Sequence, residues 1–198
     1  MTDSVPVGHG RLYYLMGASG SGKDTLLGAL IELLLERHTQ VRRVQRYITR
    51  AADAGGEYHR AVTEQQFRDL RDAGEFCMHW QAHGFSYGIH RETLGWLAAG
   101  EHVVLNGSRA YLAEARRVVP DLQPILVQVS ASVQAERLKN RGRETRDEIA
   151  ARLQRQVQLP DHEADMLTIN NDQSLEHSIA ALRELVTDDD VAWAARQS

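Results

Sequence analysis

A glycine-rich stretch near the start of the chain has the residue types and spacing of a loop that holds phosphate groups. Its seven residues are Gly17, Ala18, Ser19, Gly20, Ser21, Gly22 and Lys23, which meet the pattern G-x-x-x-x-G-K. Glycines are needed because backbone N–H groups can wrap a phosphate only through dihedrals and close approaches that side chains forbid. We expect the loop to bind ATP, with Lys23 bridging the β- and γ-phosphates as the catalytic lysine of a kinase.

The residue after Lys23 departs from the usual form of this loop. A Ser or Thr hydroxyl normally ligates Mg²⁺ there, whereas this chain has Asp24, followed by Thr25. An acidic residue often ends a later strand and supports the metal, but the strand at 102–105 runs into NGSR, which holds no carboxylate. Two interpretations stay open. Asp24 takes over part of the Mg²⁺ coordination, or it only complements the helix dipole while Thr25 reaches an α-phosphate.

The pattern of apolar residues places this loop between a strand and a helix. The run RLYYLM at 11–16 predicts a buried strand, and the leucine-rich stretch 23–36 predicts a helix whose N-terminus points at the bound anion. Further strands are predicted at 41–48, 102–105, 124–129 and 166–169. Helices are predicted at 63–73, 91–99, 111–118, 132–159 (broken at Gly142) and 174–186, with a frayed tail from Thr187. The first of these starts at Thr63, where the residues TEQQ resemble a capping box.

This alternation predicts an α/β fold of the P-loop NTPase type, with a mostly parallel sheet flanked by helices. We expect a single domain over residues 1–198, because the sequence shows no internal repeat or linker. Its core spans 10–48 and 90–186. The glycine- and aromatic-rich block that ends near 89 predicts a small insertion of short strands at 49–89. The family resemblance described below implies that this insertion binds the acceptor and that residues 137–152 form a helical lid.

Composition limits the classes of partner. The net charge of −4 provides no global field for nucleic acid, and no apolar run is long enough to span a membrane. The single cysteine excludes an intramolecular disulfide, and the first residues lack the pattern of a signal peptide, so we expect a cytoplasmic protein. All but two of the 23 basic residues are arginine, which fits clamping of phosphates as well as a bias in genomic composition. A homodimer stays open.

The chain resembles guanylate kinases over most of its length. The resemblance rests on the loop GASGSGKDTLL, the segment RYITR at 46–50, the block GEFCMHWQAHGFSYG at 74–88 and the segment ERLKNRGRETRDEIAARL at 136–153. Within that superfamily the chain looks most like the ribose 1,5-bisphosphate phosphokinases of phosphonate degradation. The resemblance implies ATP as phosphate donor, Mg²⁺ as metal, and a product that is 5-phosphoribosyl 1-diphosphate (PRPP).

The acceptor site is where the chain departs from guanylate kinases. Alignment puts Met78 where those enzymes read the base with a glutamate, and Ile89 where they use a hydroxyl. Loss of both groups removes hydrogen bonds to a guanine edge and disfavours GMP as acceptor. Met78 and Trp80 are also explained as ordinary core residues. The phosphate contacts implied by the resemblance survive at Arg50 and Tyr87, with Tyr58, Ser108 and Arg109 as further substrate-binding candidates.

The resemblance also implies a lid of arginines that close over the transferred phosphate. Arg141 and Arg152 are the implied catalytic members, Arg137 is an implied ATP contact, and Asn170 is implied near the adenine. A salt-bridged surface helix explains the same charge pattern without a function.

Two other functions stay open at this point. One is a nucleoside monophosphate kinase with altered base preference, which Met78 and Ile89 disfavour. The other is a non-catalytic binding module of the guanylate kinase type, which the intact Lys23 disfavours.

Overall fold

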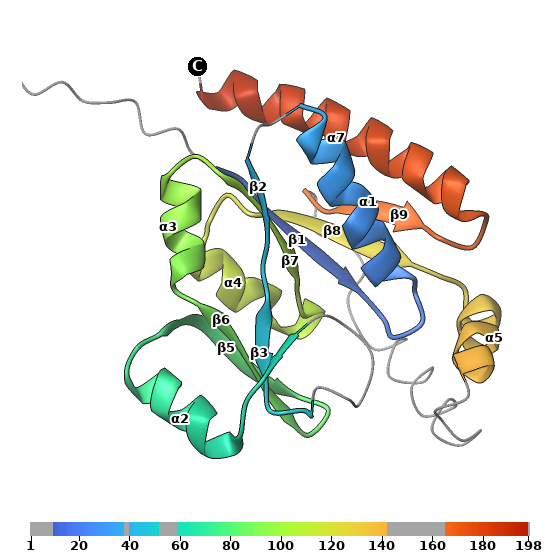
Figure 1. Cartoon of the computed structure of the whole chain (residues 1–198). Helices are drawn as coiled ribbons and strands as arrows, with labels where there is room; N and C mark the ends of the chain where they lie inside the picture. The colour runs from blue at the N-terminus through green and yellow to red at the C-terminus, as the bar shows by residue number, and fades with distance from the viewer. Residues whose placement is uncertain (1–9, 38–39, 52–58, 142–164, 198) are drawn as a thin grey trace, which may run out of the picture. The chain divides into compact units, whose positions relative to one another are not determined.

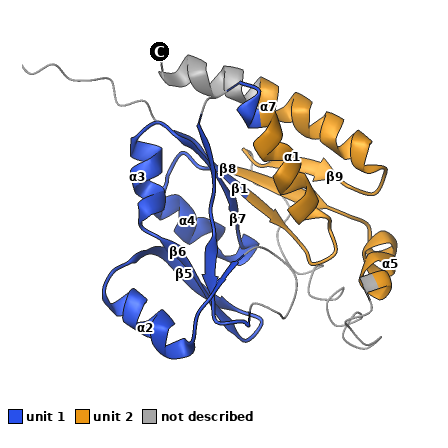
Figure 2. Ribbon diagram, viewed as in Figure 1, with its two compact units in different colours: residues 1–14, 34–123 blue, residues 15–33, 124–198 orange. Residues whose placement is uncertain are grey.

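The computed structural model describes residues 10–37, 40–51, 59–141 and 165–197 (Figure 1). The chain forms two compact units, residues 1–14 with 34–123 and residues 15–33 with 124–198 (Figure 2). Strand β1 (Leu12–Gly17) passes from the first unit into the second. No helix in the described part of the chain combines the length and the hydropathy needed to cross a bilayer.

The first unit contains one edge of a parallel sheet. Strand β2 (Val41–Arg43) pairs in parallel with β7 (His102–Asn106), and the strand order continues to the start of β1. Helix α3 (Glu92–Ala98) packs beside β7. After β7 comes a 3₁₀ turn, η2 (Arg109–Tyr111), followed by α4 (Leu112–Val118).

A second, four-stranded sheet also belongs to the first unit. Its order is β4-β3-β6-β5, with β4 at His59–Ala61, β3 at Arg46–Ile48, β6 at Phe85–His90 and β5 at Phe76–Ala82. Helix α2 (Glu64–Asp72) covers one face, where Phe67 and Phe76 pack together. The helix starts at the predicted capping box, because Thr63 and Gln66 each bond the backbone N–H of the other. Short strands are therefore observed within the expected insertion, but their sheet also includes β3, which the prediction had placed in the core.

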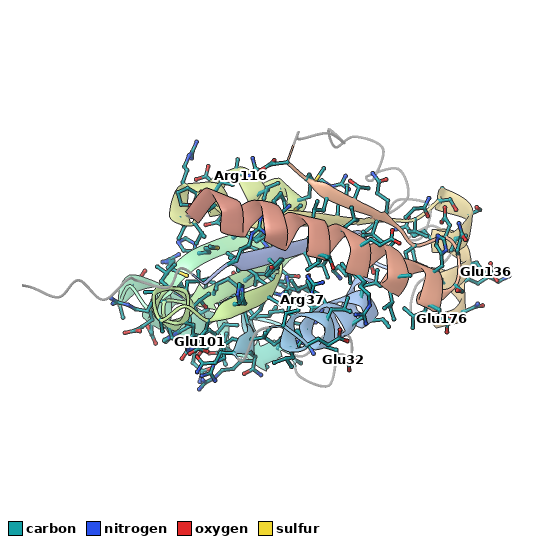
Figure 3. All side chains as sticks on the ribbon, turned by 90° about the horizontal axis from the view of Figure 1, so that it is seen from above. Glu32, Arg37, Glu101, Arg116, Glu136 and Glu176 are labelled. Atoms are coloured by element: carbon teal, nitrogen blue, oxygen red, sulfur yellow. The ribbon has the colours of Figure 1, made fainter. Side chains whose placement is uncertain are left out.

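The second unit surrounds the glycine loop. The end of β1 leads through the loop into α1 (Lys23–Leu35), and β1 is followed in the strand order by β8 (Gln123–Gln128) and β9 (Leu167–Asn170). Strands β8 and β9 pair in parallel, with Ile125 opposite Leu167. Helix α5 (Ala131–Arg141) follows β8, and α7 (Leu175–Gln197) packs beside β9. Glu32, Glu136 and Glu176 mark the solvent-facing sides of α1, α5 and α7 (Figure 3).

Two of the predicted elements differ in the structure. The strand predicted at 41–48 is two strands, because β2 joins β7 while β3 joins the insertion sheet, and a run of alternating residues does not reveal a change of partner. The prediction that the tail frays from Thr187 is wrong, since α7 continues to Gln197. No glycine or proline occurs between 175 and 197 to end the helix.

Candidate active site

The glycine loop adopts a conformation that only glycine allows at two of its turns. Gly20 and Gly22 have φ angles of +87° and +82°, in the left-handed region. A Cβ atom at Gly22 would also collide with Nδ2 of Asn171. Both the dihedral and the close approach therefore require the glycine that the pattern predicts at position 22.

One face of α5 supports the loop from outside. Gln134 donates from Nε2 to the carbonyl of Ser19 at 2.9 Å, and Leu138, fully buried one turn later, packs against the position where Gly20 would carry a Cβ. Arg137 lies between these two residues and donates to the carbonyl of Ser21 at 3.5 Å. These three side chains share a face because residues three and four apart are neighbours on a helix.

A second support comes from the segment after β9. Asn171 is buried and donates from Nδ2 to the carbonyl of Ser21 at 2.6 Å. Its Oδ1 accepts a bond from Ser178 Oγ at 2.7 Å, and its own carbonyl accepts one from Arg137 at 2.9 Å. The side-chain amide is thus held between the loop and α7, while α5 holds the backbone carbonyl of the same residue.

These contacts determine which way the loop's N–H groups point. A trans peptide directs its C=O and its N–H to opposite sides. Because the carbonyls of Ser19 and Ser21 point toward α5 and Asn171, the amides of Gly20 and Gly22 point to the opposite side of the loop. The hydroxyl oxygen of Ser21 is buried and has no hydrogen-bond partner in the described structure.

Next to the loop lies a cavity of about 400 Å³. The residues that line it are Gly20, Gly22, Thr25, Arg137, Asn140, Asn171 and Leu175. A guanidinium, two amides and a hydroxyl around an apolar contact suit a nucleotide, which offers a base and a ribose beyond its phosphates.

Asn171 lines this cavity, whereas Asn170, the residue expected near adenine, does not. Asn170 is exposed at the end of β9, and its Oδ1 accepts from the N–H of Asp172 at 2.9 Å. The resemblance implied a contact at Asn170, but it did not show which of the two adjacent asparagines turns toward the cavity. Gln134 and Ser178 carried no motif by which sequence reasoning could have found them.

Lys23 and Asp24 open helix α1 directly after the loop. Lys23 Nζ lies 3.8 Å from Asp24 Oδ2, and the two side chains are 19% and 42% exposed. Asp24 thus offers a carboxylate beside the ammonium, and Thr25 adds a hydroxyl at the cavity wall. Carboxylate and hydroxyl oxygens are ligands that Mg²⁺ accepts when substrate phosphates and water complete its shell. Among the described residues no group of three or more His, Cys, Asp or Glu side chains gathers as a metal site.

The candidate acceptor residues that the structure describes lie in the first unit. Arg50 follows β3, and Tyr87 lies in β6, where it pairs with Ile48. Thr49 and Ser86 join the two segments, because Thr49 donates to the Ser86 carbonyl at 3.1 Å and Ser86 donates to Thr49 Oγ1 at 2.9 Å. The residues next to Arg50 and Tyr87 in sequence are therefore hydrogen-bonded to each other, between β6 and the segment that follows β3.

Ser108 and Arg109 are held at the end of β7 by a buried tyrosine. The hydroxyl of Tyr14 accepts from the Ser108 N–H at 2.9 Å and donates to the Ser108 carbonyl at 3.0 Å. Burial raises the pKa of Tyr14 well above its usual value, so the hydroxyl keeps its proton and both bonds. The Ser108 hydroxyl and Arg109, which begins η2, stay candidates for ligand contact. Tyr58, Arg152 and the side chain of Arg141 lie outside the described residues.

The two positions where base contacts were expected to be missing face each other. Met78 and Ile89 are opposite residues of β5 and β6, and both are completely buried. Met78 is therefore a core residue, and the loss of base recognition stays a prediction.

The comparisons with known proteins agree with the loop geometry. The family model described as guanylate kinase matches residues 9–189. A protein of Thiobacillus denitrificans named ribose 1,5-bisphosphate phosphokinase PhnN is 46% identical over 94% of this chain and 97% of its own. One of the same name from Pantoea vagans is 48% identical over 89% of this chain and 97% of its own. A crystal structure of guanylate kinase from Anaplasma phagocytophilum shares the fold, with a TM-score of 0.67 at 19% identity over 92% of this chain and 87% of that chain.

The family model covers most of the chain, and the named relatives match it almost from end to end. The chain therefore belongs to the guanylate kinase family, and within it to the group of proteins named ribose 1,5-bisphosphate phosphokinase.

Proposed function

We propose that the protein transfers the γ-phosphate of ATP to the 1-phosphate of ribose 1,5-bisphosphate, giving PRPP and ADP in phosphonate catabolism. The observation that carries the proposal is the glycine loop before Lys23, whose amides at Gly20 and Gly22 point to the side opposite the held carbonyls of Ser19 and Ser21. Relatives that are 46% and 48% identical and carry the name of this activity support the choice of acceptor.

The donor end of the reaction uses the second unit. The loop amides and the N-terminus of α1 bind the phosphates of ATP, and Lys23 follows the γ-phosphate as it moves. Arg137 and Asn171 serve both the loop and the cavity, where the nucleoside is bound. Arg141 and Arg152 are proposed to neutralise the charge that develops on the transferred group.

The proposed magnesium site lies next to the loop that binds ATP. Asp24, with Thr25, is proposed to hold the ion through its oxygens. Bound there, Mg²⁺ neutralises charge on the β- and γ-phosphates.

The acceptor is proposed to bind to the first unit through phosphate contacts. Arg50 provides a guanidinium that can clamp a phosphate with two parallel hydrogen bonds, and Tyr87, Ser108 and Arg109 are proposed to hold the remaining phosphate and ribose oxygens. Tyr58 is proposed as a further contact. A phosphate oxygen of the acceptor is already a nucleophile, so it attacks phosphorus and ADP leaves without a general base. Transfer requires acceptor and γ-phosphate to meet in line during turnover.

A single assay tests the acceptor. The full chain is incubated with ATP and Mg²⁺ and, separately, with ribose 1,5-bisphosphate, GMP or AMP, and ADP release is followed. We expect turnover with the sugar bisphosphate and formation of PRPP. Turnover with GMP or AMP alone would identify a nucleoside monophosphate kinase, and no turnover with any acceptor would identify a non-catalytic binding module.

The metal assignment is tested on Asp24. Asp24→Asn removes the charge and keeps the shape, whereas Asp24→Ser restores the hydroxyl that other phosphate loops use at this position. We expect Asp24→Asn to raise the Mg²⁺ concentration that gives half-maximal rate by about tenfold, and Asp24→Ser to recover part of it. An unchanged Mg²⁺ dependence in both variants would assign Asp24 to the helix dipole alone.

A further inference from the structure

One face of the four-stranded sheet carries a row of planar side chains. In the register of β5, β6 and β3, Trp80 is opposite Tyr87, and Tyr87 is opposite Ile48. Residues two apart on a strand share a face, so Arg46 joins Tyr87 and Trp80 on one side of the sheet. The rings of Trp80 and Tyr87 are parallel within 2°, with centroids 5.4 Å apart, and the Arg46 guanidinium lies 5.1 Å from the Tyr87 centroid.

Tyr111 extends this row beyond the edge of the sheet. Strand β5 is an edge strand, and the N–H of His79 donates to the Tyr111 hydroxyl at 3.3 Å instead of to β6. The Tyr111 ring stacks on Trp80 with centroids 5.1 Å apart and a 28° angle between the planes. Because Tyr87 comes from the inner neighbour and Tyr111 from the open edge, the indole of Trp80 lies between two tyrosine rings.

The position of Trp80 decides what it can do. Both faces of the indole are covered, and the residue is only 9% exposed. It therefore cannot serve as a platform on which a ligand stacks. Proteins also hold nucleobases by stacking them on aromatic rings, because every base has a π-face. The indole of Trp80 is held in the same way.

We infer that Trp80 determines acceptor specificity by filling, with its own indole, a stacking position between Tyr87 and Tyr111 that a nucleotide base would otherwise occupy. The inference rests on the proposed function, since an acceptor with phosphates and no base needs no such position. The adjacent pair Met78 and Ile89, both fully buried, supplies no hydrogen-bonding group for a base edge. Nucleotide acceptors are thus excluded in two ways: the indole fills the position of the base, and the residues beside it form no hydrogen bonds with a base edge.

Removal of the indole tests this inference. In Trp80→Ala the two tyrosines are still held by the β5–β6 pairing and by the His79–Tyr111 bond, which leaves a slot of indole size. The donor site is first filled with Mg²⁺ and a non-hydrolysable ATP analogue, so that added nucleotides report on the slot alone. Binding of indole, GMP and AMP is then measured by calorimetry. We expect the variant to bind indole and both nucleotides about ten- to a hundredfold more tightly than the unmodified chain.

Two control variants separate occupancy from general damage. Trp80→Phe keeps an aromatic ring in the row and should gain little affinity for indole or nucleotide. Trp96→Ala removes a tryptophan of α3, whose ring lies under Arg42 in the same unit, and should gain none. If Trp80→Ala does not fold, Trp80→Leu is assayed in the same way, and a rise in its melting temperature on adding indole supports the slot.

A folded Trp80→Ala, or Trp80→Leu in its place, that binds neither indole nor nucleotide would overturn the inference. The result is independent of the proposed function, because the measured quantity is binding of bases. If the unmodified chain fails to phosphorylate ribose 1,5-bisphosphate, the proposed acceptor is lost, whereas the calorimetry still decides whether Trp80 fills a base slot.

Discussion

The glycine loop of the second unit and the stacked face of the first unit are built in opposite ways. The loop is kept open: Gln134 and Asn171 hold its carbonyls outward, and glycines leave space where side chains would lie. The stacked face is filled, with Trp80 between two tyrosines and Met78 against Ile89. An open loop leaves backbone groups free to meet a ligand, whereas a filled face leaves no room for one. The proposed donor site and the proposed role of Trp80 rest on this difference.

The largest effect is expected where the open loop meets its ligand. Lys23→Met removes the ammonium that follows the γ-phosphate and should lower kcat by about 10²- to 10³-fold. The melting temperature should stay unchanged, because the contact with Asp24 at 3.8 Å joins two partly exposed groups and contributes little stability. Steady-state ADP release and thermal unfolding measure the two quantities.

The chain contains its own control for this substitution. Lys139, the only other lysine, is exposed on α5, so Lys139→Met should leave kcat and melting temperature unchanged. Comparable kcat in the two variants would remove Lys23 from the catalytic machinery and with it the proposal that the open loop is the donor site.

A smaller effect is expected from closing the loop by one methyl group. Gly22→Ala places a Cβ against Asn171 and forces alanine to a φ of +82°, a conformation that costs about 1–2 kcal/mol. We expect the KM for ATP to rise about tenfold. Asn171→Ala alone should also raise it, because the Ser21 carbonyl loses a buried donor. In the double variant the collision is absent. The free-energy change calculated from its KM should therefore be smaller than the sum of the changes in the two single variants.

Another glycine provides the matched control for Gly22→Ala. Gly28 lies within α1, and a Cβ added there meets no atom within 4 Å. Gly28→Ala should therefore keep the KM for ATP and stabilise the fold by up to about 1 kcal/mol. Strict additivity of Gly22→Ala and Asn171→Ala would show that the contact between these two residues does not shape the loop.

The contrast between the two regions also explains what the sequence could predict. The loop, the strand before it and the helix after it were confirmed almost to the residue, because left-handed turns and close approaches restrict position 22 to glycine and leave a visible pattern. The capping box at Thr63 was likewise confirmed, since both partners lie within four residues. Signals of this kind are local.

The features that the sequence could not predict depend on residues far apart in the chain. Asn171 reaches a carbonyl 150 residues away, and Gln134 reaches one 115 residues away, through contacts that no short motif marks. The division of 41–48 between two sheets depended on the partners available to each half. The sequence left open whether Trp80 is a core residue or a functional one. Only the structure shows that Tyr111 of η2 covers the second face of its indole.

The smallest effect is expected at the edge of the loop's support, where Asp172 follows Asn171. The N–H of Ser130 donates to Asp172 Oδ1 at 2.7 Å, and this bond is the main cause that holds the pKa of the carboxyl below its usual range. A carboxyl whose pKa is lowered by folding stabilises the fold above its unfolded pKa of about 3.9, and that contribution is lost as the pH falls through the lower folded pKa.

Asp172→Asn keeps an acceptor for Ser130 and removes the titration. We expect the free energies of unfolding of variant and unmodified chain to differ by less than about 0.5 kcal/mol at pH 7, because the carboxyl is exposed to solvent. The variant should gain relative stability between pH 5 and pH 3, in the window where the unmodified chain loses its charge contribution. Urea unfolding across this range, with Asp172→Ala as the variant that loses the acceptor at every pH, measures it. A difference between the unmodified chain and Asp172→Asn that stays constant from pH 7 to pH 3 would show that the Ser130 bond is as strong to the neutral carboxyl as to the carboxylate.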